Sequence, residues 1–316
     1  MGPLAVLLIA GAYVGWNVGA NDAGNCVGTT VGSGLLSYRR AIMLVAAFAI
    51  LGAVLQGGHV METIGKGIVT EQLPPAALFA AMISAGLFVT LATFFRLPVS
   101  TGQAIVGSVA GVGLVVGAEV DFSRLLAIGE VWVVCPILTG LLSFVLYHVA
   151  AFLLRRAGRP VFWNRVPNLL LVLSACYVSF SMGANNVGKA VGPIANLGIS
   201  STWLALLGGV TLAIGIATFG RRVTETIARG IAPLDPLSAF AAQASAAIAI
   251  HSFSLVGIPV STSQAVVGAV VGVGLVRGAR LVRKRRIAEI AVGWVAAPTL
   301  AGVFAFAIYR LMALVL

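Results

Sequence analysis

The sequence has few charged residues. Asp, Glu, Lys and Arg make up 9% of the 316 residues, whereas a soluble domain carries roughly a quarter. Acidic residues are the scarcest, with 9 Asp and Glu against 20 Lys and Arg. Hydrophobic residues form 59% of the chain, and the mean hydropathy is +1.05. This composition excludes a soluble globular protein and indicates a polytopic membrane protein.

Cysteine and histidine are also rare, with three of each. Cys26, Cys135 and Cys176 lie far apart inside apolar runs, so neither a disulfide framework nor a metal site with thiolate ligands is indicated. A net charge of +11 would suggest nucleic-acid binding in a soluble protein. Here the basic residues lie in short clusters between apolar runs, which indicates the cytoplasmic edge of a membrane protein and no nucleic-acid partner.

Ten stretches come close to the roughly 20 apolar residues that cross a bilayer as a helix. We place them at 3–35, 41–58, 76–96, 98–117, 127–154, 167–198, 202–220, 237–256, 259–277 and 288–316. The first stretch lacks the basic leading region and the cleavage site of a signal peptide, so we expect it to stay in the protein. No connection is long enough for a separate soluble domain, so we expect one all-α transmembrane domain over 1–316.

The basic residues divide unevenly between two sides when the stretches alternate in direction. One side holds 16 of the 20, among them Arg39, Arg96 and the run 283–286. The other side holds only Lys66, Arg124 and Arg310, and Lys189 lies inside an apolar run. Because positive charge collects on the cytoplasmic side, we expect a plasma (inner) membrane protein with both termini outside.

Four motifs recur in the same order in the second half of the chain. The copies are 14–25 and 178–189, 62–68 and 225–231, 98–107 and 259–268, and Trp132…Pro136…Gly140 and Trp294…Pro298…Gly302. Each half carries an odd number of crossings, so the second half enters the membrane from the opposite side. We therefore expect two inverted repeats, 1–158 and 159–316, an arrangement typical of secondary transporters.

The spacing of glycines predicts a break in one helix of each half. Gly11, Gly15 and Gly19 are spaced by four residues, but the step from Gly19 to Gly24 is five and contains Asn21 and Asp22. The second half repeats this step from Gly183 to Gly188, around Asn185 and Asn186. Non-helical backbone inside a membrane is tolerated only where it is buried or lines a wet cavity. The two broken helices are therefore expected to form a central site.

The polar residues at the expected breaks suit a cation. Asn21, Asp22, Asn25, Asn185 and Asn186 offer hard oxygen ligands of the kind that bind Na⁺.

The duplicated Pro-Val-Ser-Thr segments suit an anion. Pro98 and Pro259 fit the first turn of a helix, where backbone N–H groups lack partners inside the helix. The residues placed there are Ser100, Thr101, Ser261 and Thr262, and Gly102 and Ser263 would let a substrate approach the backbone. Each segment is either part of two full crossings or a re-entrant hairpin. An anion site beside a cation site predicts cation-coupled oxyanion transport.

Gly19-Ala-Asn-Asp-Ala-Gly-Asn25, Gly183-Ala-Asn-Asn-Val-Gly-Lys189 and the duplicated Pro-Val-Ser-Thr-x-Gln resemble the inorganic phosphate transporter family over nearly the whole chain. The resemblance implies symport of inorganic phosphate with Na⁺ or H⁺, inverted repeats with hairpins, a homodimer in the lipid bilayer, and no cofactor. Alternating access is expected from the inverted repeats. No enzyme activity is expected, because Ser100 and Ser261 have no histidine nearby in the sequence.

The resemblance also assigns the site residues. Phosphate would be bound by Asn21, Ser100, Thr101, Asn185, Ser261 and Thr262, with Gly102 and Ser263 at the expected backbone approach. The coupling cation would be bound by Asp22, Asn25, Gln103, Asn186 and Gln264, and the metal ion expected there is Na⁺.

Two residues depart from the family pattern. Asn186 stands where the family commonly has Asp, and Lys189 stands where it commonly has Asn, so the site loses a carboxylate and gains an ammonium group. The Lys189 ammonium either replaces a coupled Na⁺ or titrates as part of proton coupling. Alternatively, the site takes sulfate or another tetrahedral oxyanion, or Lys189 points away and pairs with Glu225 or a carbonyl. An anion channel is the alternative from another functional class.

Overall fold

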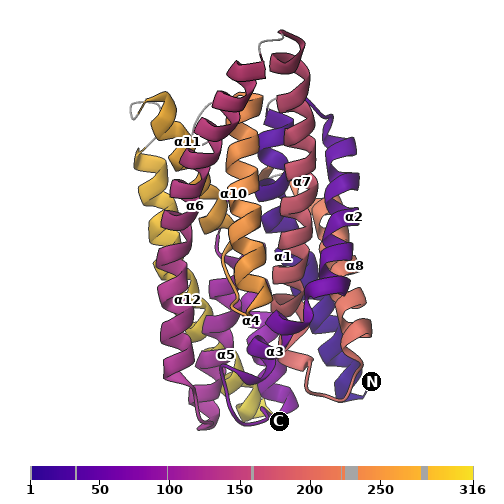
Figure 1. Cartoon of the computed structure of the whole chain (residues 1–316). Coiled ribbons are helices and arrows are strands. Elements are labelled where there is room, and N and C mark those ends of the chain that lie inside the picture. The colour runs from indigo at the N-terminus through magenta and orange to yellow at the C-terminus, as the bar shows by residue number, and fades with distance from the viewer. Residues whose placement is uncertain are drawn as a thin grey trace.

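A computed structural model describes residues 2–32, 34–97, 99–157, 160–221, 223–224, 234–278 and 284–315. Nearly all of this part of the chain is helical (Figure 1). The helices are α1 (Pro3–Gly32), α2 (Tyr38–Gln56), α3 (Gly58–Lys66), α4 (Pro75–Phe94), α5 (Thr101–Val116), α6 (Phe122–Ala157), α7 (Pro160–Val191), η1 (Gly192–Ile194), α8 (Ser201–Phe219), α10 (Pro236–Leu255), α11 (Thr262–Arg277) and α12 (Lys284–Val315).

All ten apolar stretches coincide with helices, although their ends are shifted, and α3 was not predicted. Of the helices in the described ranges, seven are long and apolar enough to cross a membrane: α1, α2, α4, α6, α7, α8 and α12.

The predicted breaks in two helices are wrong. α1 continues through Asn21 and Asp22, and α7 continues through Asn185 and Asn186. The five-residue step instead turns the glycine-lined face of the helix from one neighbouring helix to the next. On α7, a Cβ on Gly183 would lie 2.0 Å from the Ala49 carbonyl oxygen of α2, whereas one on Gly188 would lie 2.6 Å from Val60 of α3. The glycines therefore serve close helix packing, and the helix has no need to unwind.

Two hairpins, α4–α5 and α10–α11, turn back inside the molecule. Their turns meet, since the Ser263 hydroxyl at the start of α11 donates to the Val99 carbonyl before α5 at 3.2 Å. Asn21 of α1 donates to the Leu97 carbonyl in the first turn at 3.1 Å. At 1.5 Å per residue, Asn21 lies about 27 Å from the start of α1 and about 16 Å from its end. The turns thus lie well inside the length of α1, which favours re-entrant hairpins over full crossings.

The long helices connect at two opposite ends of the molecule, and both termini lie at the same end (Figure 1). The end of α6 and the start of α7 lie at the other end, together with the starts of α2 and α12. Arg39 and Arg40 begin α2, and Arg155 and Arg156 end α6. The placement of Arg96 on this Arg-rich side is wrong, because Arg96 lies in the turn of a re-entrant hairpin.

Pro98, Glu225 and Arg283 lie outside the described residues, as do four more of the 16 basic residues assigned to the Arg-rich side: Arg159, Arg222, Arg229 and Arg280.

The two halves of the chain pack through corresponding contacts. α1 packs on α8 where α7 packs on α2, and α5 packs on α12 where α11 packs on α6. A Cβ on Gly107 would lie 2.2 Å from the Pro298 carbonyl oxygen, and a Cβ on Gly268 would lie 2.1 Å from that of Pro136. All four residues belong to the duplicated motifs, so the recurring sequence corresponds to recurring backbone contacts.

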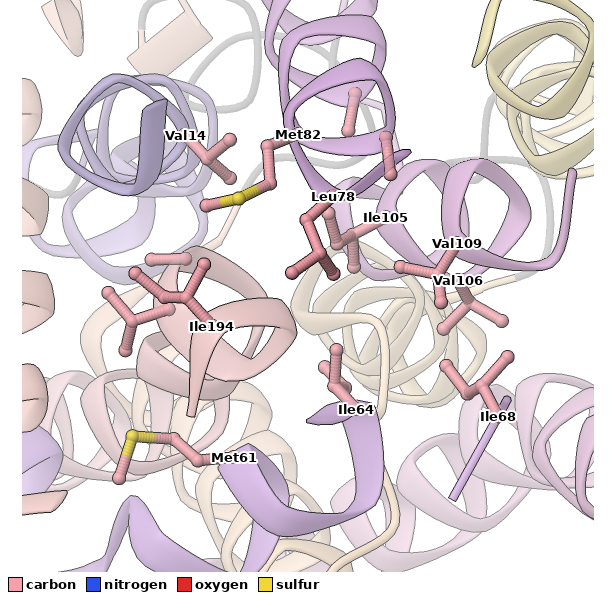
Figure 2. Close-up of a cluster of buried hydrophobic side chains, with 14 of the residues drawn as sticks. Val14, Met61, Ile64, Ile68, Leu78, Met82, Ile105, Val106, Val109 and Ile194 are labelled. Carbon is pink, nitrogen blue, oxygen red and sulfur yellow. The ribbon is translucent and has the colours of Figure 1, made fainter. Parts of the chain in front are cut away.

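Two clusters of buried apolar side chains hold the hairpins. The first surrounds α4 and α5 and includes Val14, Met82 and Ile105 (Figure 2). The second surrounds α10 and α11 and includes Cys26 and Cys135, which are buried thiols that pack as small apolar residues.

Candidate functional site

A group of polar side chains is buried where the hairpin turns meet α1 and α7. Each is at most 3% exposed: Asn21, Asp22, Asn25, Ser100, Thr101, Gln103, Asn185, Asn186, Lys189, Ser261, Thr262, Ser263 and Gln264. Gly102 is buried with them. The structure thus brings together every residue predicted for the site. Polar and charged side chains at this depth in a membrane protein are costly, which makes the group a candidate functional site.

Asn21 and Asn185 hold the backbone of the two hairpin turns. The Asn21 amide donates to the Thr93 hydroxyl at 2.8 Å and the Leu97 carbonyl at 3.1 Å, and accepts from the Val99 N–H at 3.2 Å. These bonds fix a turn between two re-entrant helices, where backbone groups would otherwise lack partners.

Asn185 does the same for the second turn. Its amide donates to the Val260 carbonyl at 2.8 Å and accepts from the Val260 N–H at 3.1 Å. Phosphate binding by Asn21 and Asn185 stays a prediction, and their contacts in the structure are positioning contacts.

The Asp22 carboxylate connects three helices through hydrogen bonds. Its carboxylate accepts from Asn186 of α7 at 2.7 Å and from the Thr101 hydroxyl of α5 at 3.1 Å. It also accepts from Asn25, one turn along α1, at 3.2 Å. Three donors on one buried carboxylate offset part of the cost of removing its charge from water.

The helices α5 and α11 both begin at the site, with the same cap. The Ser100 hydroxyl accepts from the Gln103 N–H at 3.3 Å, and the Ser261 hydroxyl accepts from the Gln264 N–H at 3.2 Å. A helix N-terminus carries partial positive charge and free N–H donors, and so attracts anions. Two such termini meet here, which supports the predicted anion site.

Three amide oxygens in the site have no hydrogen-bond partner although they are buried: Asn25 Oδ1, Gln103 Oε1 and Gln264 Oε1. A buried acceptor left without a partner costs about 1–3 kcal/mol. Amide oxygens are hard ligands of the kind that bind small alkali and alkaline-earth cations. All three residues were predicted to bind the cation, and their chemistry fits that role.

Lys189 extends from α7 into the site. Its ammonium group is fully buried and donates to Asn186 Oδ1 at 2.6 Å. The amide of Asn186 therefore links the Lys189 ammonium to the Asp22 carboxylate. Lys189 does not point away from the site, and its partner is the side-chain carbonyl of Asn186.

Sequence reasoning missed Thr93, Leu97, Val99 and Val260. Val99 and Val260 stand inside the duplicated Pro-Val-Ser-Thr motif, but they act through backbone groups, which a motif of side chains does not reveal. Thr93 lies on α4 and carries no motif signal.

The model of a family described as the phosphate transporter family matches residues 18–166 and again residues 163–305. The chain belongs to the phosphate transporter family.

Proteins named as phosphate transporters or permeases align along nearly the whole chain. Inorganic phosphate transporter 2-1 of Arabidopsis thaliana is 29% identical over an alignment that covers 98% of this chain and 73% of the relative. A protein of Pyrococcus furiosus named as a candidate phosphate permease is 28% identical, with 97% and 95% covered. A solved structure described as the sodium-dependent phosphate transporter matches with a TM-score of 0.90, 28% identity and full coverage of both chains. These matches confirm the family resemblance and the all-α membrane fold.

Proposed function

We propose that the protein is a secondary active transporter that imports inorganic phosphate together with Na⁺ by alternating access. One observation carries this proposal: two helix N-termini, the Asp22 carboxylate and three unpartnered amide oxygens meet in a single buried centre. Donors for an anion and acceptors for a cation therefore lie in the same place. An anion and a cation bound together partly neutralise each other, which lowers the cost of holding either away from water.

Na⁺ is favoured over H⁺ as the coupling ion by the chemistry of these oxygens. Asn25, Gln103 and Gln264 offer amide oxygens, which coordinate cations but do not take up a proton near neutral pH. The matching solved structure is that of a sodium-dependent transporter, which supports the same choice.

We propose that 1–158 and 159–316 are inverted repeats. Supporting observations are the family model, which matches twice in succession, and the corresponding helix contacts of the two halves. α1 and α7 also run in opposite directions along the molecule (Figure 1). Rocking of one repeat against the other would expose the centre to the two sides in turn.

We place the Arg-rich end in the cytoplasm and both termini outside, in the plasma (inner) membrane. Large apolar side chains on α6 and α12, among them Ile137 and Val295, are 60% and 74% exposed. Such faces suit the lipid bilayer or a second copy of the chain in a homodimer.

The test is uptake of radiolabelled phosphate by proteoliposomes, driven first by an inward Na⁺ gradient and then by an inward H⁺ gradient. Na⁺-driven, saturable uptake that excess sulfate leaves unchanged is the expected result. Uptake driven by H⁺ alone would reassign the coupling ion, and competition by sulfate would favour a permease for another oxyanion. Conductance without saturable accumulation would indicate an anion channel.

A further inference from the structure

The duplicated motifs place two pairs of residues at corresponding positions. Asn25 ends the first Gly-Ala-Asn motif and Lys189 ends the second, while Ser263 and Gly102 follow the two copies of Pro-Val-Ser-Thr. Asn25 lies with Ser263, and Lys189 lies with Gly102, and each of these pairs forms a corner of the site. In the α1–α11 corner, the Asn25 amide donates to Ser263 Oγ at 3.0 Å and to Thr262 Oγ1 at 3.4 Å.

The α7–α5 corner brings the corresponding positions together, but with different chemistry. Lys189 lies beside Gly102, where an added Cβ would be 3.1 Å from Lys189 Cε and 3.5 Å from Nζ. The absent side chain at position 102 leaves room for the long stem of Lys189. An amide and a hydroxyl in one corner thus correspond to an ammonium and a glycine in the other.

The two corners differ in what they offer a mobile cation. Asn25 Oδ1 is a buried amide oxygen without a hydrogen-bond partner. An ammonium group has three donors and no acceptor, so Lys189 offers a cation no ligand and repels it. Asn186 accepts from Lys189 at 2.6 Å and donates to Asp22 at 2.7 Å, which places the ammonium one amide away from the carboxylate. The positive charge that a bound cation would bring to this corner is already built into the chain.

We propose that the Lys189 ammonium is a tethered cation that fills one of two corresponding cation positions, so that one Na⁺, bound at the α1–α11 corner, accompanies each phosphate. This inference rests on the proposed function of Na⁺-coupled phosphate transport. In this inference, the fixed charge of Lys189 takes the place of one Na⁺ in the transport stoichiometry.

The test is the limiting accumulation of phosphate by proteoliposomes at zero membrane potential and equal pH on both sides. The logarithm of the phosphate ratio is plotted against the logarithm of the imposed Na⁺ ratio, and the slope is the number of Na⁺ ions per phosphate. We expect a slope near one for the wild-type protein. A wild-type slope near two overturns the tethered cation, and it does so without any variant.

The matched variant carries Lys189→Asn together with Gly102→Ser, which copies the α1–α11 corner into the α7–α5 corner. We expect its slope to rise to near two, because the second position then takes a mobile Na⁺. A variant that accumulates phosphate with an unchanged slope also overturns the inference. Absence of any Na⁺-driven uptake by the wild-type protein is a separate result, because it contradicts the proposed function itself.

Discussion

At Asp22, one carboxylate accepts hydrogen bonds from α1, α5 and α7 and lies one amide away from the Lys189 ammonium. The removal of one partner of a buried charge pair leaves the other charge uncompensated, which costs about 3–5 kcal/mol. We therefore expect the stability of the protein to depend more on the presence of both charges than on any single hydrogen bond at Asp22.

We expect Asp22→Asn to lower the free energy of unfolding by about 3 kcal/mol, because the Lys189 charge then lacks its counter-charge. Adding Lys189→Asn should restore at least about 1 kcal/mol of this loss, since the double variant buries no charge at these positions. Unfolding of the purified proteins in detergent measures both changes. A double variant that is less stable than Asp22→Asn alone would argue against electrostatic coupling between the two residues.

Thr93 offers a second test at the residue scale, because its hydroxyl accepts from the Asn21 amide. We expect Thr93→Val to destabilise the protein by about 1–3 kcal/mol, since it leaves a buried N–H without that partner. The control is Thr299→Val, which removes an exposed hydroxyl that bonds only to a carbonyl of its own helix. Equal stability of the two variants would show that the Asn21–Thr93 hydrogen bond does not stabilise the protein.

At the scale of elements, apolar length predicts the long helices, because only helices and closed barrels satisfy their backbone in lipid, and a run of about 20 apolar residues suits a helix. The duplicated motifs mark residues that the structure brings together, such as Asp22 and Thr101. The partner of each residue was not predictable: Asn21 bonds to a turn that begins more than 70 residues later in the chain. The break expected near Asn21 was wrong because glycine spacing reports both packing and flexibility, and here it reports packing.

Gly19 tests the packing role of these glycines. A Cβ at this position would lie 2.1 Å from the Leu212 carbonyl oxygen, so α8 would have to move away from α1. We expect Gly19→Ala to cost about 1–3 kcal/mol in stability, as overpacking does elsewhere. Gly129→Ala on α6 meets no atom within 4 Å and should be neutral or stabilising by up to about 1 kcal/mol. Similar unfolding temperatures for both variants would contradict the close α1–α8 contact.

At the scale of the whole molecule, the two halves share their backbone contacts but not their charges. Gly107 with Pro298 and Gly268 with Pro136 make the same helix contact twice. The corners of the site differ instead, because Lys189 corresponds to Asn25. A symmetric scaffold can therefore carry an asymmetric site, and the asymmetry sets how many cations the site has to bind.

The placement of the Arg-rich end in the cytoplasm can be tested with two matched serines. Ser37 precedes α2 at that end, and Ser200 precedes α8 at the end that carries the termini. Both are exposed, and neither side chain caps its helix. Cys26 and Cys135 are buried, so only Cys176 needs replacement by alanine before single cysteines are introduced.

In intact cells, a membrane-impermeant maleimide should label Ser200→Cys directly and Ser37→Cys only after permeabilisation. Arginines retain their charge and resist translocation, so the helices insert with Arg39 and Arg40 inside. Phosphate uptake by each variant serves as the control for correct folding. The reverse labelling pattern in active variants would show that the protein has the opposite orientation in the membrane, with both termini in the cytoplasm. The α1–α11 corner would keep its ligands in either case, because orientation changes the side from which Na⁺ arrives and leaves the number of Na⁺ ions bound unchanged.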